Sequence, residues 1–408
     1  MKKFLIVSII LILVAATAFG ASLYHFVDLN KSEATVDEVA PTQAPTKATE
    51  KEVEKTKVEL PESFKDNGIF SENYEKAYEY VSSMSTEQMV GQMLLSACPT
   101  DETAQTLMSK YALSGYIYTA DNFFGMSESE IKSLIDSYQE KASTPMIMAV
   151  EEEGGAVTAI SDLDAFPQYD FGSPRDVFAE GGLDALKESE QRKATMLSSV
   201  GINLNLAPVC DMADDFTQIM YSRSLGGTVE ETGQYVKNTT EISQNSGVSV
   251  ALKHFPGYGT MPDSFDEVKV DTREVTTFEQ NDFKPFGAGI DADAHCVMMS
   301  NVLVQNLDPT CIASLSDYIH TVLKDRIGFT GLIITDNLNN ADYSAYANEN
   351  DVYVQAVLAN NDLIIVDKVE EAYMAILSAV KDGKIEEEVL EKACTRIIAY
   401  KYTAGIMK

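Results

Sequence analysis

The chain has 408 residues, of which 45% are apolar, so it can bury a large core and is not disordered as a whole. It carries 31 Lys and Arg against 63 Asp and Glu, which gives a formal net charge of −32. This charge is repelled by nucleic acid phosphates and anionic lipid head groups, so nucleic acid is excluded as an expected partner.

The first 28 residues are typical of a segment that directs a chain to export. Lys2 and Lys3 precede an apolar run from Phe4 to Tyr24. Small residues near its end suit a signal peptidase, and its length of about 20 residues also suits a helix that stays in the membrane. Residues 1–28 therefore predict a signal peptide or a membrane anchor. We expect an exported protein, extracellular or membrane-anchored with its folded part outside the cytoplasm, that contacts the membrane through this segment only.

Residues 29–68 are rich in Thr, Glu, Lys, Ala and Pro and have few aromatic side chains. Such a segment cannot bury enough apolar surface to order itself, which predicts a disordered linker. The folded domain is then residues 69–408. Five widely spaced cysteines without a C-x-x-C pair favour small buried side chains over disulfides or a structural zinc site.

From residue 69 onward, short apolar runs rich in β-branched residues alternate with amphipathic stretches of helical period. This alternation predicts parallel strands joined by crossover helices. Eight candidate strands begin near residues 92, 115, 145, 202, 248, 296, 331 and 362. Eight is the number that closes a barrel, so the expected fold class is α/β, a single (β/α)8 TIM-type barrel. A doubly wound open sheet is the alternative, but Gly154 and Gly155 lack the further glycines of its phosphate loop.

Charged side chains follow the carboxyl ends of several predicted strands, where the active sites of such barrels lie. These residues are Glu151 to Glu153, Asp211, Lys253, His254 and Asp336. Capping of the next helix explains single carboxylates but not Lys253 and His254, because cations are disfavoured at helix N-termini. The pattern predicts one polar pocket at this end of the barrel.

Motifs around these residues occur in a fixed order along the chain. They are EEEGGAV at Glu151, GINLNLAPVCD at Gly201, RSLGG at Arg223, KHFPGYG at Lys253 and GFTGLIITDNL at Gly328. Together they resemble glycoside hydrolase family 3, and the FPG after His254 favours its β-N-acetylhexosaminidase branch. The similarity extends from about Met84 to about Lys401, nearly the whole predicted barrel.

The resemblance implies a retaining glycosidase for β-linked N-acetylhexosamine in cell-wall or related glycans, with Asp336 as the nucleophile. The substrate-binding residues that it implies are Glu151, Arg223, Lys253 and His254. A cation such as Lys253 beside Asp336 would favour the ionised carboxylate that a nucleophile needs. The expected partner is a carbohydrate substrate, no metal or organic cofactor is implied, and we expect a monomer.

The sequence departs from the family where the family carries its general acid and base. The loop after KHFPG usually ends in Asp-Ser-His, and here it reads DSF, with Asp263 retained and Phe265 in place of the histidine. Phenylalanine cannot transfer a proton. Asp263 alone, or a strand-end carboxylate such as Glu152, is left to protonate the leaving oxygen.

Three further departures leave two hypotheses open. Glu151 stands for an aspartate, Ala156 for an arginine and Tyr258 for a common histidine. One hypothesis is an active exo-hydrolase that retains its nucleophile. The other is a catalytically impaired barrel that binds glycan or another wall component without hydrolysing it, because family resemblance supports fold better than activity.

Other side chains have less specific interpretations. His295 precedes a predicted strand and His320 lies in a helical pattern, so both are expected to be structural. Tyr118, Phe123 and Phe124 follow the second predicted strand and are candidates to stack on a sugar.

Overall fold

The computed structural model of the protein describes residues 59–262 and 268–408. The predicted signal peptide or anchor, residues 1–28, and the linker up to residue 58 lie outside these ranges. Within them, no helix combines the length and the apolar character needed to cross a membrane.

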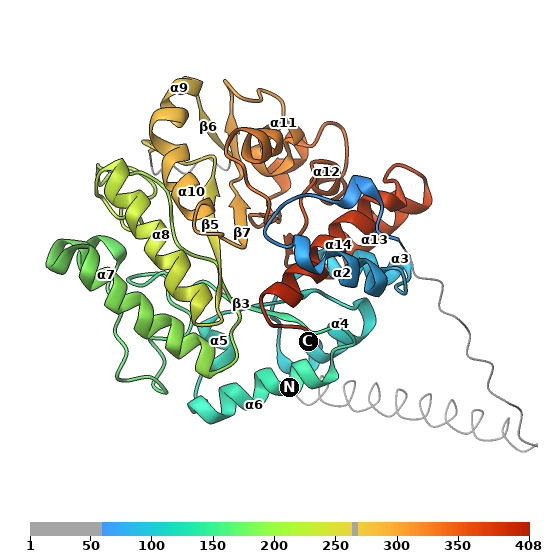
Figure 1. The fold of residues 1–408 in the computed structure, drawn as a ribbon, viewed down its shortest axis with the longest axis horizontal. Helices are drawn as coiled ribbons and strands as arrows, with labels where there is room; N and C mark the ends of the chain where they lie inside the picture. The colour runs from blue at the N-terminus through green and yellow to red at the C-terminus, as the bar shows by residue number, and fades with distance from the viewer. Residues whose placement is uncertain (1–58, 263–267) are drawn as a thin grey trace, which may run out of the picture. The chain divides into compact units, whose positions relative to one another are not determined.

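Eight parallel strands form the central sheet, in the order β10-β1-β2-β3-β4-β5-β7-β9 (Figure 1). Their bounds are β1 Leu94–Ala97, β2 Gly115–Tyr118, β3 Ile147–Val150, β4 Leu204–Asn205, β5 Ser249–Phe255, β7 Cys296–Met299, β9 Leu332–Thr335 and β10 Ile364–Val366. All eight predicted strands are present, and neighbours follow the chain order around the ring. The predicted (β/α)8 TIM-type barrel is confirmed. The open doubly wound alternative is wrong, because in that fold the strand order reverses partway along the sheet.

The helices lie outside this ring (Figure 1). They are α2 Tyr74–Val81, α3 Thr86–Gln92, α4 Asp101–Tyr111, α5 Ala120–Phe123, α6 Glu128–Lys141, α7 Pro174–Ser199, α8 Val229–Asn245, α9 Val275–Thr277, α10 Phe283–Ile290, α11 Asp317–Thr321, α12 Val352–Leu358, α13 Val369–Lys381 and α14 Glu387–Thr403. Capping boxes fix the start of four of them, with Ser85, Thr119, Ser127 and Thr228 as the N-cap residues.

A second, two-stranded parallel sheet was not predicted. It pairs β6, Lys269–Asp271, with β8, Val302–Val304, beside the barrel. Each strand has only three residues, too few to stand out as a separate apolar run, and in β6 the side chain of Val270 is also exposed.

The barrel ring closes between β9 and β10 through one parallel bridge, from Ile334 to Leu363. A side chain supplements the backbone at this seam, because Asp362 Oδ2 accepts a hydrogen bond of 2.9 Å from the backbone N–H of Ile333. Asp362 is buried, so ring closure depends on a carboxylate as well as on strand pairing.

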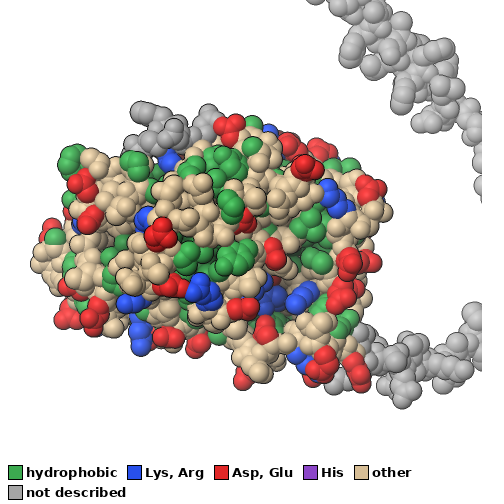
Figure 2. Space-filling view, turned by 90° about the horizontal axis from the view of Figure 1, so that it is seen from above, with side chains coloured by type: hydrophobic (Ala, Val, Ile, Leu, Met, Phe, Trp, Pro, Cys, Tyr) green, Lys and Arg blue, Asp and Glu red, His purple; other side chains and the backbone are tan. Residues whose placement is uncertain are grey.

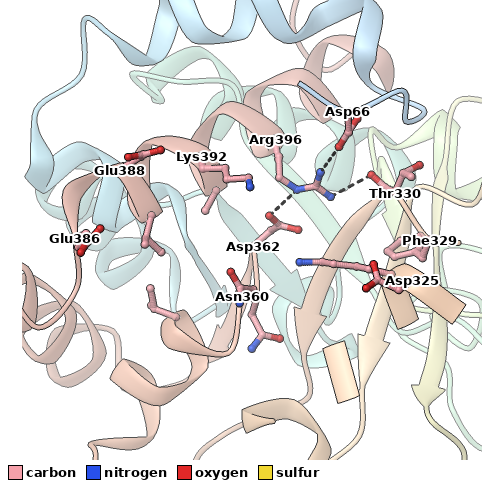
Figure 3. Close-up of a pocket in the computed structure, with 15 residues that line it drawn as sticks. Asp66, Asp325, Phe329, Thr330, Asn360, Asp362, Glu386, Glu388, Lys392 and Arg396 are labelled. Atoms are coloured by element: carbon pink, nitrogen blue, oxygen red, sulfur yellow. Dashed lines mark hydrogen bonds and ion pairs between the residues drawn. The ribbon is translucent and has the colours of Figure 1, made fainter. Parts of the chain in front are cut away.

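Arg396 of α14 forms an ion network at the amino ends of the strands (Figure 3). Its Nε donates to Asp362 at 3.0 Å and its Nη1 donates to Asp66 at 3.0 Å. Its Nη2 donates to the backbone carbonyls of Thr330 and Gly331. The guanidinium is thus occupied on all three nitrogens by fixed partners.

Residues 59–68, the end of the predicted linker, contact the barrel. Phe64 is buried, and Asp66 is one of the partners of Arg396. Packing against the barrel therefore begins before residue 69.

The five cysteines are all free, and every one except the half-buried Cys98 is buried, in agreement with the sequence. Acidic side chains are distributed over the face seen in Figure 2, with fewer basic ones among them. This distribution is that of a solvated acidic surface, which favours solubility and indicates no particular partner.

Candidate active site

The carboxyl ends of β3, β4, β5 and β9 carry the charged residues that the sequence singled out. Because parallel strands end on the same side of a barrel, these residues lie at one end of it. Lys253 is the most deeply placed, with a fully buried side chain. Its Nζ lies 2.6 Å from Glu153 Oε1 and 2.8 Å from Glu151 Oε1.

The charge of Lys253 is stabilised by these carboxylates. Burial lowers the pKa of Lys253, but Glu153 and Glu151 outweigh burial and leave it above its ordinary value. The ammonium group therefore stays protonated although no water reaches it.

Glu153 joins Lys253 to Arg223. Its side chain is 2% exposed and accepts two hydrogen bonds from the guanidinium, 2.9 Å from Nε and 2.6 Å from Nη2. Burial raises the pKa of Glu153, but the two cations outweigh it and lower the pKa to about 2. Lys253, Glu153 and Arg223, with the 46% exposed Glu151 at the edge, form what we call the strand-end cluster.

Glu152 has a different role from its neighbours. Its Oε2 accepts hydrogen bonds from the backbone N–H groups of Ala159, at 2.9 Å, and Ile160, at 2.8 Å. Its Oε1 accepts from the hydroxyl of Ser161. The carboxylate is buried and holds the loop after β3, so the hypothesis that Glu152 protonates the leaving oxygen is wrong.

Asp211 positions His254. Its Oδ2 lies 2.8 Å from His254 Nδ1, and since a carboxylate only accepts, Nδ1 carries the proton. The same carboxylate accepts from the backbone N–H groups of His254 and Tyr258. No described residue bonds His254 Nε2, which leaves that nitrogen able to contact a ligand.

Asp336 follows β9 and is half-buried. Its Oδ1 accepts a hydrogen bond of 2.7 Å from the backbone N–H of Asn337. Burial and then the carboxylate of Asp336 raise the pKa of Tyr258 well above its ordinary value, and they raise that of Tyr343 as well. Asp336 therefore lies near Tyr258, whose ring packs edge-on against His254 with centroids 5.3 Å apart.

The structure thus brings together Glu151, Arg223 and Lys253 in one ion cluster. It also places His254 against Tyr258, the tyrosine whose pKa the carboxylate of Asp336 helps to raise. One expectation was wrong, because the described partners of Lys253 are Glu151 and Glu153 rather than Asp336.

Asp263, the predicted catalytic acid, and Phe265 lie outside the described residues. Glu153 and Asp211 are the residues whose roles the sequence did not assign. Both were visible as strand-end carboxylates, but their partners come from other strands and could not be read from spacing.

His295 and His320, which were expected to be structural, have fixed partners in the fold. Burial lowers the pKa of His295 to about 4, and its Nδ1 lies 2.8 Å from Ser249 Oγ. His320 is buried and bonds Ser316 and Asn361. Tyr118 and Phe123 are buried against each other, which removes both as sugar platforms, whereas Phe124 is 85% exposed.

The described residues contain no group of three or more His, Cys, Asp or Glu arranged to hold a metal ion.

Comparison with known proteins shows similarity to one family over most of the chain. The model described as "Glycosyl hydrolase family 3 N terminal domain" matches residues 85–400. A beta-hexosaminidase of Xylella fastidiosa (strain M23) is 28% identical over 254 residues, which cover 61% of this chain and 75% of that protein. A beta-hexosaminidase of Xanthomonas campestris pv. campestris (strain B100) is 26% identical, with coverage of 61% and 76%.

Solved structures share the fold. The glycoside hydrolase family 3 beta-N-acetylglucosaminidase of Paenibacillus sp. str. FPU-7 has a TM-score of 0.73 and 25% identity, and the match covers 79% of this chain. This chain spans only 63% of that protein's length. The beta-N-acetylhexosaminidase of Beutenbergia cavernae DSM 12333 has a TM-score of 0.70 and 23% identity, with coverage of 78% and 99%.

Proposed function

The chain belongs to glycosyl hydrolase family 3, and from that premise we propose that it is an exo-acting hydrolase of β-linked N-acetylhexosamine. The names of its relatives, beta-hexosaminidase and beta-N-acetylglucosaminidase, support this substrate class. Cell-wall and related glycans are the substrates we propose.

The strand-end cluster is the observation that carries this proposal. Lys253 and Arg223 are cations that share one buried acceptor, Glu153. Sugars present many hydroxyl and amide groups that must each be matched when they are buried, and charged donors match them most strongly. Because Glu151 is half-exposed, it can release Lys253 to a hydroxyl of an incoming sugar at small cost.

The proposed reaction proceeds by two displacements. The carboxylate of Asp336 forms a bond to the anomeric carbon while the bond from that carbon to the leaving oxygen breaks and the oxygen receives a proton. Water then attacks the anomeric carbon and gives a proton to the group that protonated the leaving oxygen, the bond from the carbon to Asp336 breaks, and the sugar leaves with its original configuration. We propose that His254 Nε2 binds the sugar, and the hydrogen bond between His254 Nδ1 and Asp211 supports this because it fixes the ring.

The proton donor limits the expected rate. Glu152 is committed to the loop after β3, which leaves Asp263 as the proposed acid. Loss of a dedicated proton donor costs on the order of 10²- to 10⁴-fold in rate. Substrates with good leaving groups, which need little protonation, should therefore turn over fastest.

The test is hydrolysis of an aryl N-acetyl-β-glucosaminide by the purified protein and by Asp336→Asn. We expect activity in the former, a loss on the order of a thousandfold or more in the latter, and the β-anomer as the first product seen by NMR. Activity that persists in Asp336→Asn removes the nucleophile assignment. An α-anomer as first product removes the retaining mechanism.

A catalytically impaired barrel that binds glycan is the second candidate. It is favoured by Phe265 at the position of the family's histidine and by the engagement of Glu152 elsewhere. Calorimetry with wall fragments separates the two, since binding without product release supports the second candidate and turnover supports the first.

We also propose that residues 1–28 export the barrel and that it acts outside the cytoplasm. Cell fractionation tests this. A protein found only in the cytoplasm would contradict it.

A further inference from the structure

The segment between two residues of the site forms a projecting loop. Asp211, which holds His254, and Arg223, which pairs with Glu153, stand at its two ends. We call residues 212–222 the rim loop. Both of its ends are fixed by buried contacts, so its position relative to the site is determined by the site itself.

Arg175 of α7 joins the two arms of the rim loop. Its Nη2 donates to the carbonyl of Ala213 at 2.7 Å, and its Nε donates to the carbonyl of Tyr221 at 2.9 Å. The guanidinium also lies over the Tyr221 ring, 4.0 Å from its centroid. One buried contact set therefore ties the start of the loop to its end.

The tip of the loop is held by its own side chains. Gln218 Oε1 accepts from the backbone N–H of Asp214 at 2.8 Å, and Gln218 Nε2 donates to the Asp214 carboxylate at 2.9 Å. Asp215 Oδ1 accepts from both the backbone N–H and the hydroxyl of Thr217. These bonds define one conformation of the tip.

The rim loop is also joined to the segment that follows β5. The backbone N–H of Ile219 donates to the carbonyl of Met261 at 3.0 Å, and Gln218 forms a bridge with Pro262. Two segments that leave neighbouring strands thus form a continuous wall beside the site.

Phe216 lies at the tip of this fixed loop with 78% of its surface exposed. Together with Phe124 it is the most exposed large apolar side chain of the described residues. Single exposed apolar residues are common, but here the polar tip of the loop, residues 214–218, is ordered by at least four side-chain bonds around an aromatic ring that faces water. Phe216 is five residues from Asp211, so its Cα lies within about 18 Å of that residue.

We propose that Phe216 is a stacking platform for a pyranose ring on the leaving-group side of the glycan, an inference that rests on the proposed function. The strand-end cluster binds the terminal sugar in the buried part of the site. Any further sugar extends toward solvent and passes the rim. The C–H face of a pyranose packs on the face of an aromatic ring, and a ring held in place loses little entropy on binding.

The absence of tryptophan from the sequence gives a direct test. Phe216→Trp in the full chain introduces a single indole whose emission responds to a sugar stacked on it. Tyr318→Trp is the control, because Tyr318 is also an exposed aromatic side chain, 53% exposed, but lies on α11, outside the barrel ring. Asp336→Asn in both proteins prevents turnover during the titration.

We expect triacetylchitotriose to shift the emission of Phe216→Trp and N-acetylglucosamine to leave it unchanged, with no shift in Tyr318→Trp. Phe216→Ala should weaken trisaccharide binding about three- to tenfold and leave the affinity for N-acetylglucosamine unchanged. The proposal that Phe216 is a stacking platform would be wrong if Phe216→Ala bound the trisaccharide as tightly as the unsubstituted protein and the emission of Phe216→Trp did not change. Failure of either sugar to bind the unsubstituted protein would contradict the proposed function, and the platform would fall with it.

Discussion

The two ends of the barrel both bury an arginine among carboxylates, but they leave it in different states. At the amino ends, Arg396 is bonded by Asp362, Asp66 and two backbone carbonyls (Figure 3). At the carboxyl ends, Arg223 and its neighbour Lys253 bond side chains alone, and one of these, Glu151, is half-exposed.

The comparison shows that a cavity alone does not make a binding site. A binding site also needs hydrogen-bond donors that can exchange their protein partners for a ligand. A cavity of about 540 Å³ opens beside Arg396, yet the arginine there has no donor nitrogen free for a ligand. Backbone carbonyls cannot move away from a cation without unfolding the strand, whereas a half-exposed glutamate can. The first arrangement stabilises the fold, and the second can exchange partners with substrate.

The largest expected effect is on stability and concerns Arg396, at the amino ends of the strands. Arg396→Met leaves Asp362 and Asp66 without a cation in a buried setting, and breaking such a pair costs about 3 to 5 kcal/mol of unfolding free energy. The activity of the folded fraction should not change. Urea denaturation measures the cost, and Lys110→Met at the exposed pair with Glu370 is the control, expected to cost under about 1 kcal/mol. A comparable loss in both variants would contradict the comparison.

The next effect tests the carboxyl end. Glu153→Gln leaves Lys253 and Arg223 without their shared charge, and we expect kcat/KM to fall about a hundredfold because both cations shift from the sugar-binding geometry. Glu152→Gln, an equally buried neighbour, should lower stability more than activity. If the two variants lose activity equally, Glu153 has no special role in the site.

Acidification should affect the amino and carboxyl ends of the strands differently, because His295 gains a proton on unfolding in this pH range and Glu153 does not. Burial keeps His295 neutral in the fold with a pKa of about 4, while the unfolded chain binds a proton below about 6.5. Stability is therefore complete above pH 6.5 and falls toward pH 4, by up to about 1.4 kcal/mol per pH unit from this residue. Glu153, with a pKa of about 2, stays charged throughout this window. His295→Gln should reduce the pH dependence of urea denaturation and leave the part that comes from His320, which is also buried with a pKa of about 4. An unchanged slope would show that His295 does not titrate on unfolding.

The smallest expected effect concerns Glu151. Because it is half-exposed and Lys253 keeps Glu153 as a partner, Glu151→Gln should change KM only about two- to fivefold, with kcat nearly constant. Steady-state kinetics on the aryl substrate measures this. An effect larger than that of Glu153→Gln would reverse the order of importance within the cluster.

The sequence predicted the strands because each lies in a mainly apolar run. It missed β6 and β8, which have three residues each and pair with each other outside the barrel, and β6 is also partly exposed. Strand-end position also found Lys253, His254 and Asp336. It could not separate Glu152 from Glu153, since both are buried and adjacent, and only the path of the turn after β3 directs one to backbone N–H groups and the other to cations.

The seam between β9 and β10 has a consequence for when the barrel can fold during synthesis. Asp362 bonds Ile333 across the seam and Arg396 in α14, so ring closure depends on a residue that follows all eight strands in the chain. A nascent chain that lacks α14 has the eight strands but not the cation that holds the closing carboxylate. We therefore expect the barrel to complete its fold only after α14 has been synthesised, and not strand by strand as the chain emerges.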